Sequence, residues 1–234
     1  MHTARVVSAR TLSSTVRELC FAAGPEFTFV PGQWISLRIP QPGGEEIGRS
    51  YSIASPPRGD GTFEIAVTRV EGGPASNQLH HVEVGTEYRM SVAQGFFTLA
   101  PVERPVLMVA TGTGVAPLRS MLLAADARGE LSRQPFVLLF GGRTEGDRLY
   151  CDDFAALAAR HATFVYDAAL SRPSDAWTGS KGYVQLHVPS HVRRLGVPCD
   201  VYVCGVSRMV RDVRTVLKEQ LGLTREHIHT ERYD

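Results

Sequence analysis

The sequence predicts two domains, an N-terminal antiparallel β-barrel with Greek-key topology and a following α/β domain built on a parallel sheet. Three observations support this. Short strands with alternating polarity fill the chain up to about residue 99, continuous apolar strands alternate with helical segments from residue 106, and a proline-rich break separates them. The break, Pro101-Val-Glu-Arg-Pro105, places the expected domains at residues 1–101 and 102–234.

The strands of the first domain follow the alternation of apolar and polar residues. Alternation predicts strands over Thr15–Phe21, Trp34–Ile39 and Phe63–Val70. Pro31-Gly32 and Gly43-Gly44 mark turns between them. Such regular spacing indicates an antiparallel barrel or sandwich, and a Greek-key barrel if the strands close on themselves.

The strands of the second domain are apolar throughout, as expected where both faces of a parallel sheet are covered. We expect strands over 106–110, 136–140, 162–166 and 201–204, and helices over 116–127, 152–160 and 208–221. Because strand and helix alternate, the sequence predicts a parallel sheet with helices on both faces.

Composition excludes several classes of protein. With 25 Lys and Arg against 24 Asp and Glu, the net charge of +1 gives no bulk attraction to nucleic acid or an anionic membrane. No window approaches the ~18 apolar residues of a membrane span, so we expect no membrane insertion and a cytoplasmic protein. The four scattered cysteines fit neither a disulfide framework nor an iron–sulfur cluster, and no metal site is expected.

The segment Arg49-Ser50-Tyr51-Ser52 has the residue types that hold a flavin without a covalent link. A flavin needs a planar partner for its ring, a hydrogen bond near N5 and positive charge or amide donors for its phosphates. In a strand, Arg49 and Tyr51 point to one face while Ser52 turns to the other. The alternative is an ordinary strand with a surface arginine and a half-buried tyrosine.

A second segment, Glu71-Gly72-Gly73-Pro-Ala-Ser76-Asn77, places glycines and a Ser/Asn pair at the start of a short helix. Glycines let the backbone approach a pyrophosphate, and free N–H groups at a helix N-terminus attract it. A hairpin turn with an N-cap serine is the alternative. Together the two segments favour FAD over FMN.

The loop Thr111-Gly112-Thr113-Gly114-Val-Ala-Pro117 follows an apolar strand and opens a helix, as a phosphate-binding glycine loop does. No Asp or Glu closes the next strand, where Phe140 runs into Gly141-Gly-Arg143, so the ordinary Rossmann pattern with an acidic ribose clamp is not met.

Taken in this order, the motifs resemble those of the ferredoxin–NADP reductase superfamily over nearly the whole chain. Further matching pieces are Pro31-Gly-Gln33, Cys204-Gly205-x-x-x-Met209 and Glu231-Arg-Tyr233. The resemblance implies an FAD-binding antiparallel barrel followed by a nucleotide-binding parallel-sheet domain, with the nicotinamide brought against the flavin where the domains meet.

The resemblance also implies roles for individual residues. It places Arg49 at the flavin pyrophosphate, Tyr51 on the ring, Ser52 near N5 and Ser76 at a phosphate. The remaining cofactor contacts implied are those of Ser50, Gly72, Gly73, Asn77, Thr111, Gly112, Thr113, Gly114, Pro117, Gly205 and Met209.

Three residues are implied to be catalytic: Ser52, Cys204 and Glu231. Cys204 is expected beside the reacting nicotinamide carbon, although a buried core thiol is an equal alternative. Glu231 and Tyr233 resemble a C-terminal acid and aromatic that approach the flavin, and one residue, Asp234, follows the tyrosine in this sequence.

Ser171 and Arg172 lie where NADP-dependent members place a serine and an arginine for the 2′-phosphate, with Lys181 and Tyr183 shortly after. Arginine suits a phosphate because its planar fork donates two hydrogen bonds. A plain solvated loop is the alternative, and we expect NADP in preference to NAD.

The expected function is transfer of electrons from NAD(P)H through FAD to a separate carrier such as ferredoxin, flavodoxin or an oxygenase component. A free-flavin reductase is one alternative, which the chain resembles in length and in Phe140-Gly-Gly-Arg143 followed by Leu149-Tyr150, although Gly72-Gly73-x-x-Ser76 argues against it. A regulatory electron-transfer subunit or redox-sensing interaction module is another. Fold analogy does not choose among acceptors.

Overall fold

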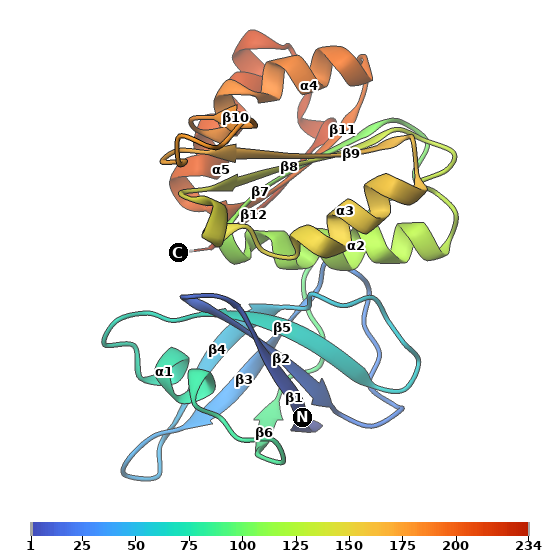
Figure 1. Cartoon of the computed structure of the whole chain (residues 1–234). Coiled ribbons are helices and arrows are strands. Elements are labelled where there is room, and N and C mark those ends of the chain that lie inside the picture. Colours follow the sequence, from blue (N-terminus) through green and yellow to red (C-terminus); the bar gives the residue numbers. More distant parts are fainter. Residues whose placement is uncertain (1, 234) are drawn as a thin grey trace.

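The computed structural model describes residues 2–233, which form two sheets stacked one above the other (Figure 1). The first sheet is antiparallel and has the strand order β4-β3-β6-β1-β2-β5. Its strands are β1 (His2–Ser13), β2 (Val16–Ala22), β3 (Trp34–Pro40), β4 (Glu46–Ser52), β5 (Thr62–Thr68) and β6 (Glu87–Met90).

This first sheet curls into a barrel because its two edge strands meet at one end. Ile53 and Ile65 form an antiparallel bridge, and the Ala54 N–H donates to the Glu64 carbonyl at 2.7 Å. Alternating side chains from all six strands fill the interior, where Phe21 and Phe63 stack with ring centroids 5.4 Å apart. The helix α1 (Pro74–His80) packs at one side of this core through Ala75 and Leu79.

The second sheet is parallel, with the strand order β10-β9-β8-β7-β11-β12. Its strands are β7 (Val106–Thr111), β8 (Phe136–Gly142), β9 (Phe164–Leu170), β10 (Ser180–Lys181), β11 (Asp200–Val206) and β12 (Ile228–Tyr233). The helices are α2 (Val115–Ala127), α3 (Cys151–Arg160), α4 (Val188–Leu195) and α5 (Ser207–Thr215), and α5 continues as a wider turn over Val216–Gln220. Short 3-10 turns cover Gly112–Gly114, Glu145–Asp147, Val184–Leu186 and Arg225–His227.

Helices cover both faces of this sheet. The α2 and α3 side chains pack on one face, with Met108 and Leu138, and the α4 and α5 side chains pack on the other, with Leu107 and Leu139. The α2 face is turned toward the barrel (Figure 1). Because successive strand residues point to opposite faces, an all-apolar strand is what two covered faces require.

The predicted fold class is confirmed, with differences at particular elements. β9 begins at Phe164 and runs to Leu170, later and longer than the expected 162–166, because its carboxyl half carries the small residues Ala168 and Ala169 inside the sheet. The short strand β10, the helix α4 and the edge strand β12 were not predicted. The domain boundary at 101/102 stays a prediction and falls in the connection between β6 and β7.

Within residues 2–233, no helix has the length and apolar character needed to cross a membrane.

Candidate active site

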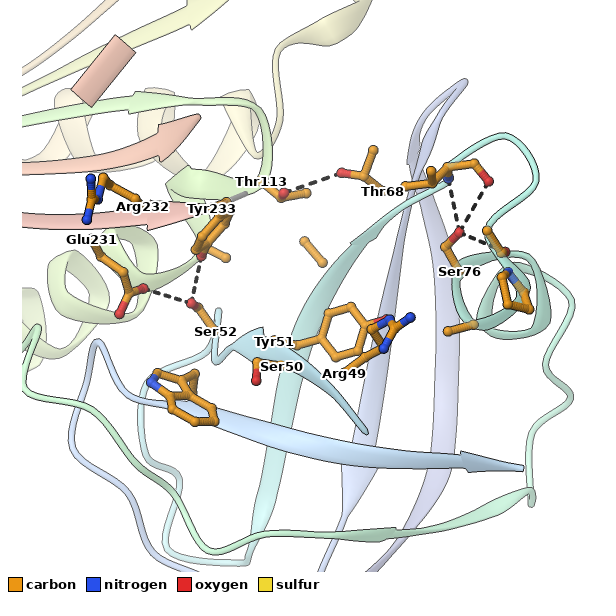
Figure 2. Close-up of a pocket in the computed structure, with 17 residues that line it drawn as sticks. Arg49, Ser50, Tyr51, Ser52, Thr68, Ser76, Thr113, Glu231, Arg232 and Tyr233 are labelled. Atoms are coloured by element: carbon orange, nitrogen blue, oxygen red, sulfur yellow. Dashed lines mark hydrogen bonds between the residues drawn. The ribbon is translucent and has the colours of Figure 1, made fainter. Parts of the chain in front are cut away.

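A pocket of about 650 Å³ opens where the barrel meets the α/β domain. Its barrel wall is the carboxyl half of β4, the end of β5 and the start of α1, and its other wall is the first turn of α2 and the end of β12 (Figure 2). We call it the interdomain pocket. It is lined by Trp34, Arg49, Ser50, Tyr51, Ser52, Ala66, Thr68, Val70, Gly73, Pro74, Ala75, Ser76, Thr113, Ala116, Glu231, Arg232 and Tyr233.

The strand β4 brings four predicted residues, Arg49 to Ser52, to this pocket. Pairing of Tyr51 with Ile35 and of Ser52 with Trp34 fixes their register on β3. Ser52 is buried, Arg49 is exposed and Tyr51 is partly buried. Burial raises the pKa of Tyr51 to about 12, so the phenol stays neutral at physiological pH. A neutral aromatic ring therefore lies two residues from an exposed cation, Arg49, whose Nη1 donates to the Gly48 carbonyl at 2.9 Å.

Ser52 is the centre of a cluster that joins the barrel to β12. The Ser52 hydroxyl donates to Glu231 Oε1 at 3.1 Å and accepts from the Tyr233 hydroxyl at 2.6 Å (Figure 2). The Cys204 thiol lies 4.0 Å from the same Glu231 oxygen. The three residues predicted to be catalytic, Ser52, Cys204 and Glu231, are thus brought together from three different strands.

Burial sets the protonation of this cluster. It raises the pKa of Glu231 above its ordinary value, although the hydrogen bond from Ser52 acts in the opposite direction. Burial, reinforced by the Glu231 carboxylate, also raises the pKa of Cys204, so that residue remains a thiol. Because its pKa is raised, Glu231 holds a proton up to a higher pH than an exposed glutamate does.

The segment from Val70 to Asn77 forms a tight loop at the other end of the pocket. The Ser76 hydroxyl accepts from the Val70 N–H at 3.0 Å, and the Asn77 side chain donates to the Gly73 carbonyl at 2.8 Å. Gly72 adopts φ +70°, which favours glycine. Gly73 and Ser76 line the pocket, and Gly72 and Asn77 support the loop behind it. The Ser76 hydroxyl is thus engaged within the loop.

The predicted nucleotide loop lies at the carboxyl ends of β7 and β11. An added Cβ at Gly114 would lie 2.4 Å from the Cys204 carbonyl oxygen, and one at Gly205 would lie 2.4 Å from Thr111 Oγ1, so both close approaches require glycine. Gly205 also has φ +149°. Met209, on α5, packs against Gly205. In the described chain, the buried Thr111 hydroxyl has no hydrogen-bond partner, which leaves a donor and an acceptor at this junction.

Ser171 and Arg172 lie outside the interdomain pocket, directly after β9. Their backbone N–H groups donate to the Gly142 and Arg143 carbonyls at 3.1 and 2.7 Å. Arg172 and Arg143 are exposed. Because the strands are parallel, this corner is on the same edge of the sheet as the loop Gly112–Gly114, where nucleotides bind in open α/β sheets.

The structure therefore separates the predicted residues into groups. Those at the interdomain pocket are Arg49, Ser50, Tyr51, Ser52, Gly73, Ser76, Thr113, Glu231 and Tyr233. Thr111, Gly112, Gly114, Pro117, Cys204, Gly205 and Met209 are at or beside the β7–β11 junction. The predicted roles of these residues stay predictions.

Several pocket residues were not predicted. Ala66 and Thr68 reach the pocket from β5, and Trp34 does so from β3. The alternation of Phe63 to Val70 would have placed Ala66 and Thr68 on one face of their strand. The pairing of β4 with β3 that brings Trp34 in is a long-range contact that no local pattern contains.

The residues present fit an FAD. A 650 Å³ pocket with an aromatic side chain, an exposed arginine and a glycine-containing loop offers surfaces for the flavin ring and its phosphates. The β7–β11 junction holds the loop Gly112–Gly114 and the buried, unpartnered Thr111 hydroxyl, and its use by a nicotinamide nucleotide stays a prediction.

Comparisons with known proteins agree with this arrangement. Residues 3–99 match the oxidoreductase FAD-binding domain family, and residues 108–215 match the oxidoreductase NAD-binding domain family. The chain is 47% identical to ferredoxin–NADP reductase B of Sorangium cellulosum, covering 99% of this chain and 97% of the relative. It is 31% identical to the anthranilate 1,2-dioxygenase electron transfer component of Acinetobacter baylyi, with coverage of 89% and 59%. The chain thus spans nearly all of the first relative and about three-fifths of the second.

A solved structure supports the fold. The ferredoxin NADP⁺ reductase of Neisseria gonorrhoeae, solved with bound FAD and NADP, superposes with a TM-score of 0.84 at 19% identity, covering 98% of this chain and 97% of that one. At this identity the likeness concerns the fold. From the two domain matches, the relative at 47% identity and this shared architecture, it follows that the chain belongs to the ferredoxin–NADP reductase superfamily of FAD- and NAD(P)-dependent oxidoreductases.

Proposed function

We propose that this protein oxidises NADPH through a bound FAD and passes the electrons one at a time to a ferredoxin. The observation that carries the proposal is the interdomain pocket, which joins the β4 segment Arg49–Ser52 to the β12 residues Glu231 and Tyr233 beside the nucleotide loop. Bound FAD supplies the chemistry, since it accepts two electrons as hydride and releases them singly.

The residues of the chain bind and orient the two nucleotides. Tyr51 gives the flavin ring an apolar face, and Arg49 is available for the pyrophosphate. The loop Gly112–Gly114 receives the nicotinamide nucleotide, because it opens α2, whose N-terminal amides favour phosphate, and because Gly114 lets it pack closely against the Cys204 backbone. Cys204 lies between the two sites, with its backbone against Gly114 and its thiol 4.0 Å from Glu231. Its side chain limits how closely the nicotinamide ring approaches the sheet.

The buried cluster is suited to handling the proton that accompanies the electrons. Glu231 Oε1 accepts from Ser52, which itself accepts from Tyr233. Because its pKa is raised by burial, the Glu231 carboxyl takes up a proton more readily than a solvated glutamate. Ser52 would then relay that proton between Glu231 and the flavin edge of the pocket.

NADPH is favoured over NADH by the charges at the carboxyl ends of β8 and β9. Arg143 and Arg172 are exposed there, and the β8 strand ends in Gly141-Gly142 instead of the acid that binds an unphosphorylated ribose. Two guanidinium groups at this edge suit a 2′-phosphate.

The partner is a separate electron carrier. The two matched domains bind FAD and NAD, and neither is an iron–sulfur domain that could receive electrons from the flavin. The relative that matches over nearly its whole length is named as a ferredoxin–NADP reductase. The relative named as an electron transfer component of a dioxygenase is longer than this chain. All four cysteines are unpaired, as in proteins of a reducing compartment, and the proposal includes a cytoplasmic location.

The test begins with the purified protein after desalting. We expect about one FAD per chain, faster bleaching of the flavin with NADPH than with NADH, and reduction of cytochrome c that depends on added ferredoxin and falls with salt. Tyr51→Ala should release FAD, whereas Tyr183→Ala, at an exposed tyrosine on the other domain, should retain it.

Other outcomes would replace the proposal. A colourless protein that reduces added riboflavin, with no gain from any carrier protein, would identify a free-flavin reductase. Flavin that is bound but is not reduced by either nucleotide alone would identify a regulatory or redox-sensing subunit. Transfer to flavodoxin or to an oxygenase component in place of ferredoxin would keep the reductase and change its partner.

A further inference from the structure

Arg119 is a buried arginine on α2, where the α/β domain meets the barrel, and its side chain is 7% exposed. Its Nε donates to Asp153 on α3 at 2.6 Å, within the same domain. Its Nη1 donates across the domain interface, to the Ala54 carbonyl at 2.9 Å and to Glu64 Oε2 at 2.7 Å. A single guanidinium group therefore holds both domains.

The surroundings make this position specific. The guanidinium carbon lies 4.3 Å from the centre of the Tyr150 ring, and Glu64 is also paired with Arg58. The guanidinium groups of Arg119 and Arg58 thus pair with the carboxylates of Glu64 and Asp153. Buried charges tolerate little displacement, because a guanidinium group that loses a partner in a dry site is left with an uncompensated charge. Next to it, the Ser120 hydroxyl donates to the Ser55 carbonyl at 2.6 Å.

Besides the bond between Arg119 of α2 and Glu64 of β5, the turn that leads into α2 contacts β5 at the interdomain pocket. The Thr68 hydroxyl of β5 donates to the Thr113 hydroxyl at 3.3 Å, just before α2 (Figure 2). Along β5, Glu64, Ala66 and Thr68 share one face because side chains alternate. Ala116 and Arg119 of α2 share one face with Thr113 of the preceding 3-10 turn, because three residues make nearly one turn. We call this pairing of faces the α2–β5 contact.

The α2–β5 contact sets where the nucleotide loop lies relative to the flavin site. The loop Gly112–Gly114 leads directly into α2, and β5 and β4 carry the barrel wall of the pocket. Ala66 and Ala116 are small and line the pocket, so their side chains interlock little at the middle of the contact. Phe97 and Tyr202 also pack across the domain interface, away from β5, and the polar bonds at the two ends of the α2–β5 contact join β5 itself to α2 and the loop before it.

We propose that Arg119 is a positioning residue for hydride transfer. By binding Glu64 and the Ala54 carbonyl, it holds α2 at the register on β5 that places the nicotinamide against the flavin. The inference rests on the proposed NADPH-to-FAD reaction. Because transfer requires reacting atoms within a narrow range of distance, a shift of about 1 Å would slow the reaction roughly a hundredfold without removing either binding site.

The experiment compares Arg119→Met, Arg119→Lys and the control Arg128→Met. Arg128 lies at the end of the same helix, is 48% exposed and pairs only with Glu130 in its own domain. For Arg119→Met we expect wild-type FAD content and an NADPH dissociation constant within about twofold of wild type. Its limiting rate of flavin reduction should fall roughly ten- to a hundredfold. Arg119→Lys should recover part of the rate, and Arg128→Met should match the wild type.

A second measurement does not depend on activity. Hydrogen exchange of the flavin-free protein should become faster in Arg119→Met around Ala54 and Ser120, where the domains meet, and stay unchanged in the β8 strand. Glu64→Gln removes the opposite charge on the barrel side. It should reproduce both effects, and it carries the same test if Arg119→Met does not fold.

The proposal is overturned if Arg119→Met, or Glu64→Gln in its place, keeps the wild-type limiting rate while only thermal stability falls. It is also overturned if the rate falls only together with FAD content or NADPH affinity, or if exchange at the interface is unchanged. A wild-type protein that no nicotinamide nucleotide can reduce would overturn the proposed function instead, and the exchange result on the flavin-free protein would still report whether Arg119 joins the domains.

Discussion

Individual residues in the site gain their chemistry from burial. Cys204 and Glu231 are polar groups on neighbouring strands of a parallel sheet, at paired register positions. Had both been exposed, neither would have differed from an ordinary thiol or carboxylate. Inside the domain interface, the acid is held near Ser52 and the thiol is kept protonated. The proposed roles of the two residues are therefore distinct: an acid that exchanges a proton, and a thiol that fills space beside the nicotinamide.

We expect Cys204→Ala to slow flavin reduction while leaving FAD content intact. The alanine removes the sulfur that packs beside the nicotinamide position, and small misplacements there are costly, so the limiting rate should fall by about tenfold or more. Stopped-flow mixing with NADPH measures it. Cys199→Ala is the matched control, because Cys199 is also buried but lies directly before β11, whereas Cys204 lies near the end of that strand. If both variants keep the wild-type rate and lose only stability, Cys204 is a core thiol.

Local sequence patterns predicted many of the site residues but not which of them contact one another in the folded protein. The glycine loop from Gly112 to Gly114 was recognisable because glycine spacing after an apolar strand reports a local backbone requirement. The contact of Ser52 with Glu231 joins residues 179 positions apart, and only the folded sheets bring them together. Resemblance to a family placed both residues near the flavin without pairing them, whereas alternation and periodicity could not place them at all.

At the scale of elements, strands with a clear period were predicted best. β5 and β7 have strong alternation or continuous apolar runs, and their observed bounds differ from the expected ones by two residues or fewer. β12 escaped prediction because His229, Thr230 and Glu231 interrupt it with polar side chains. Glu231 accepts from Ser52 across the domain interface and His229 stacks on Tyr202, so the polar side chains that make these contacts also hide the strand character of β12.

The corner formed by the ends of β8 and β9 should control nucleotide choice. We expect Arg172→Ala to raise the KM for NADPH roughly ten- to a hundredfold with little change in kcat, since a charge-assisted contact of about 1.5–3 kcal/mol remote from the nicotinamide contributes equally to ground and transition states. The KM for NADH should be unchanged.

Steady-state kinetics with both nucleotides checks this prediction, with Arg193→Ala on α4 as an exposed control. An equal or better rate with NADH in the wild type would contradict it, as would an Arg172→Ala enzyme that loses affinity for both nucleotides alike.

At the scale of the whole molecule, the two domains share one largely buried ionic group, and the apolar core beneath α2 also takes in the barrel residues Ala54, Ala66 and Phe97. Burial alone would raise the pKa of Glu64, but hydrogen bonds from Arg58 and Arg119 outweigh it and hold the pKa below its ordinary value of 4.5. The unfolded chain therefore binds a proton at Glu64 more readily than the folded chain does. The stabilisation is complete above that ordinary value and is lost as the pH falls through the lower folded-state pKa.

This linkage predicts the pH dependence of a Glu64→Gln variant. Between about pH 6 and pH 8 the variant should unfold with a free energy roughly 1.5–3 kcal/mol lower than the wild type, because a charged hydrogen-bond partner of Arg119 is lost. Below about pH 4.5 the difference should shrink. Urea denaturation across this range measures it, with Glu130→Gln as the control, because Glu130 pairs with Arg128 within one domain. A difference that stays constant down to acid pH would show that the loss is one of packing.

The position of β12 at the edge of its sheet has a further consequence for ligand sensing. The strand has a single hydrogen-bonded neighbour, β11, yet it carries Glu231 and Tyr233 into the barrel side of the site. Edge strands open at lower free energy than central ones, so the β12 amides should be among the least protected in the second sheet. A ligand in the interdomain pocket that contacts both Tyr51 and Tyr233 would bind only when the strand is closed, and its binding free energy would add to that of closure. Hydrogen exchange of the β12 amides would then slow as a larger fraction of the pockets is occupied. Exchange in this one strand would therefore report how much cofactor the protein holds.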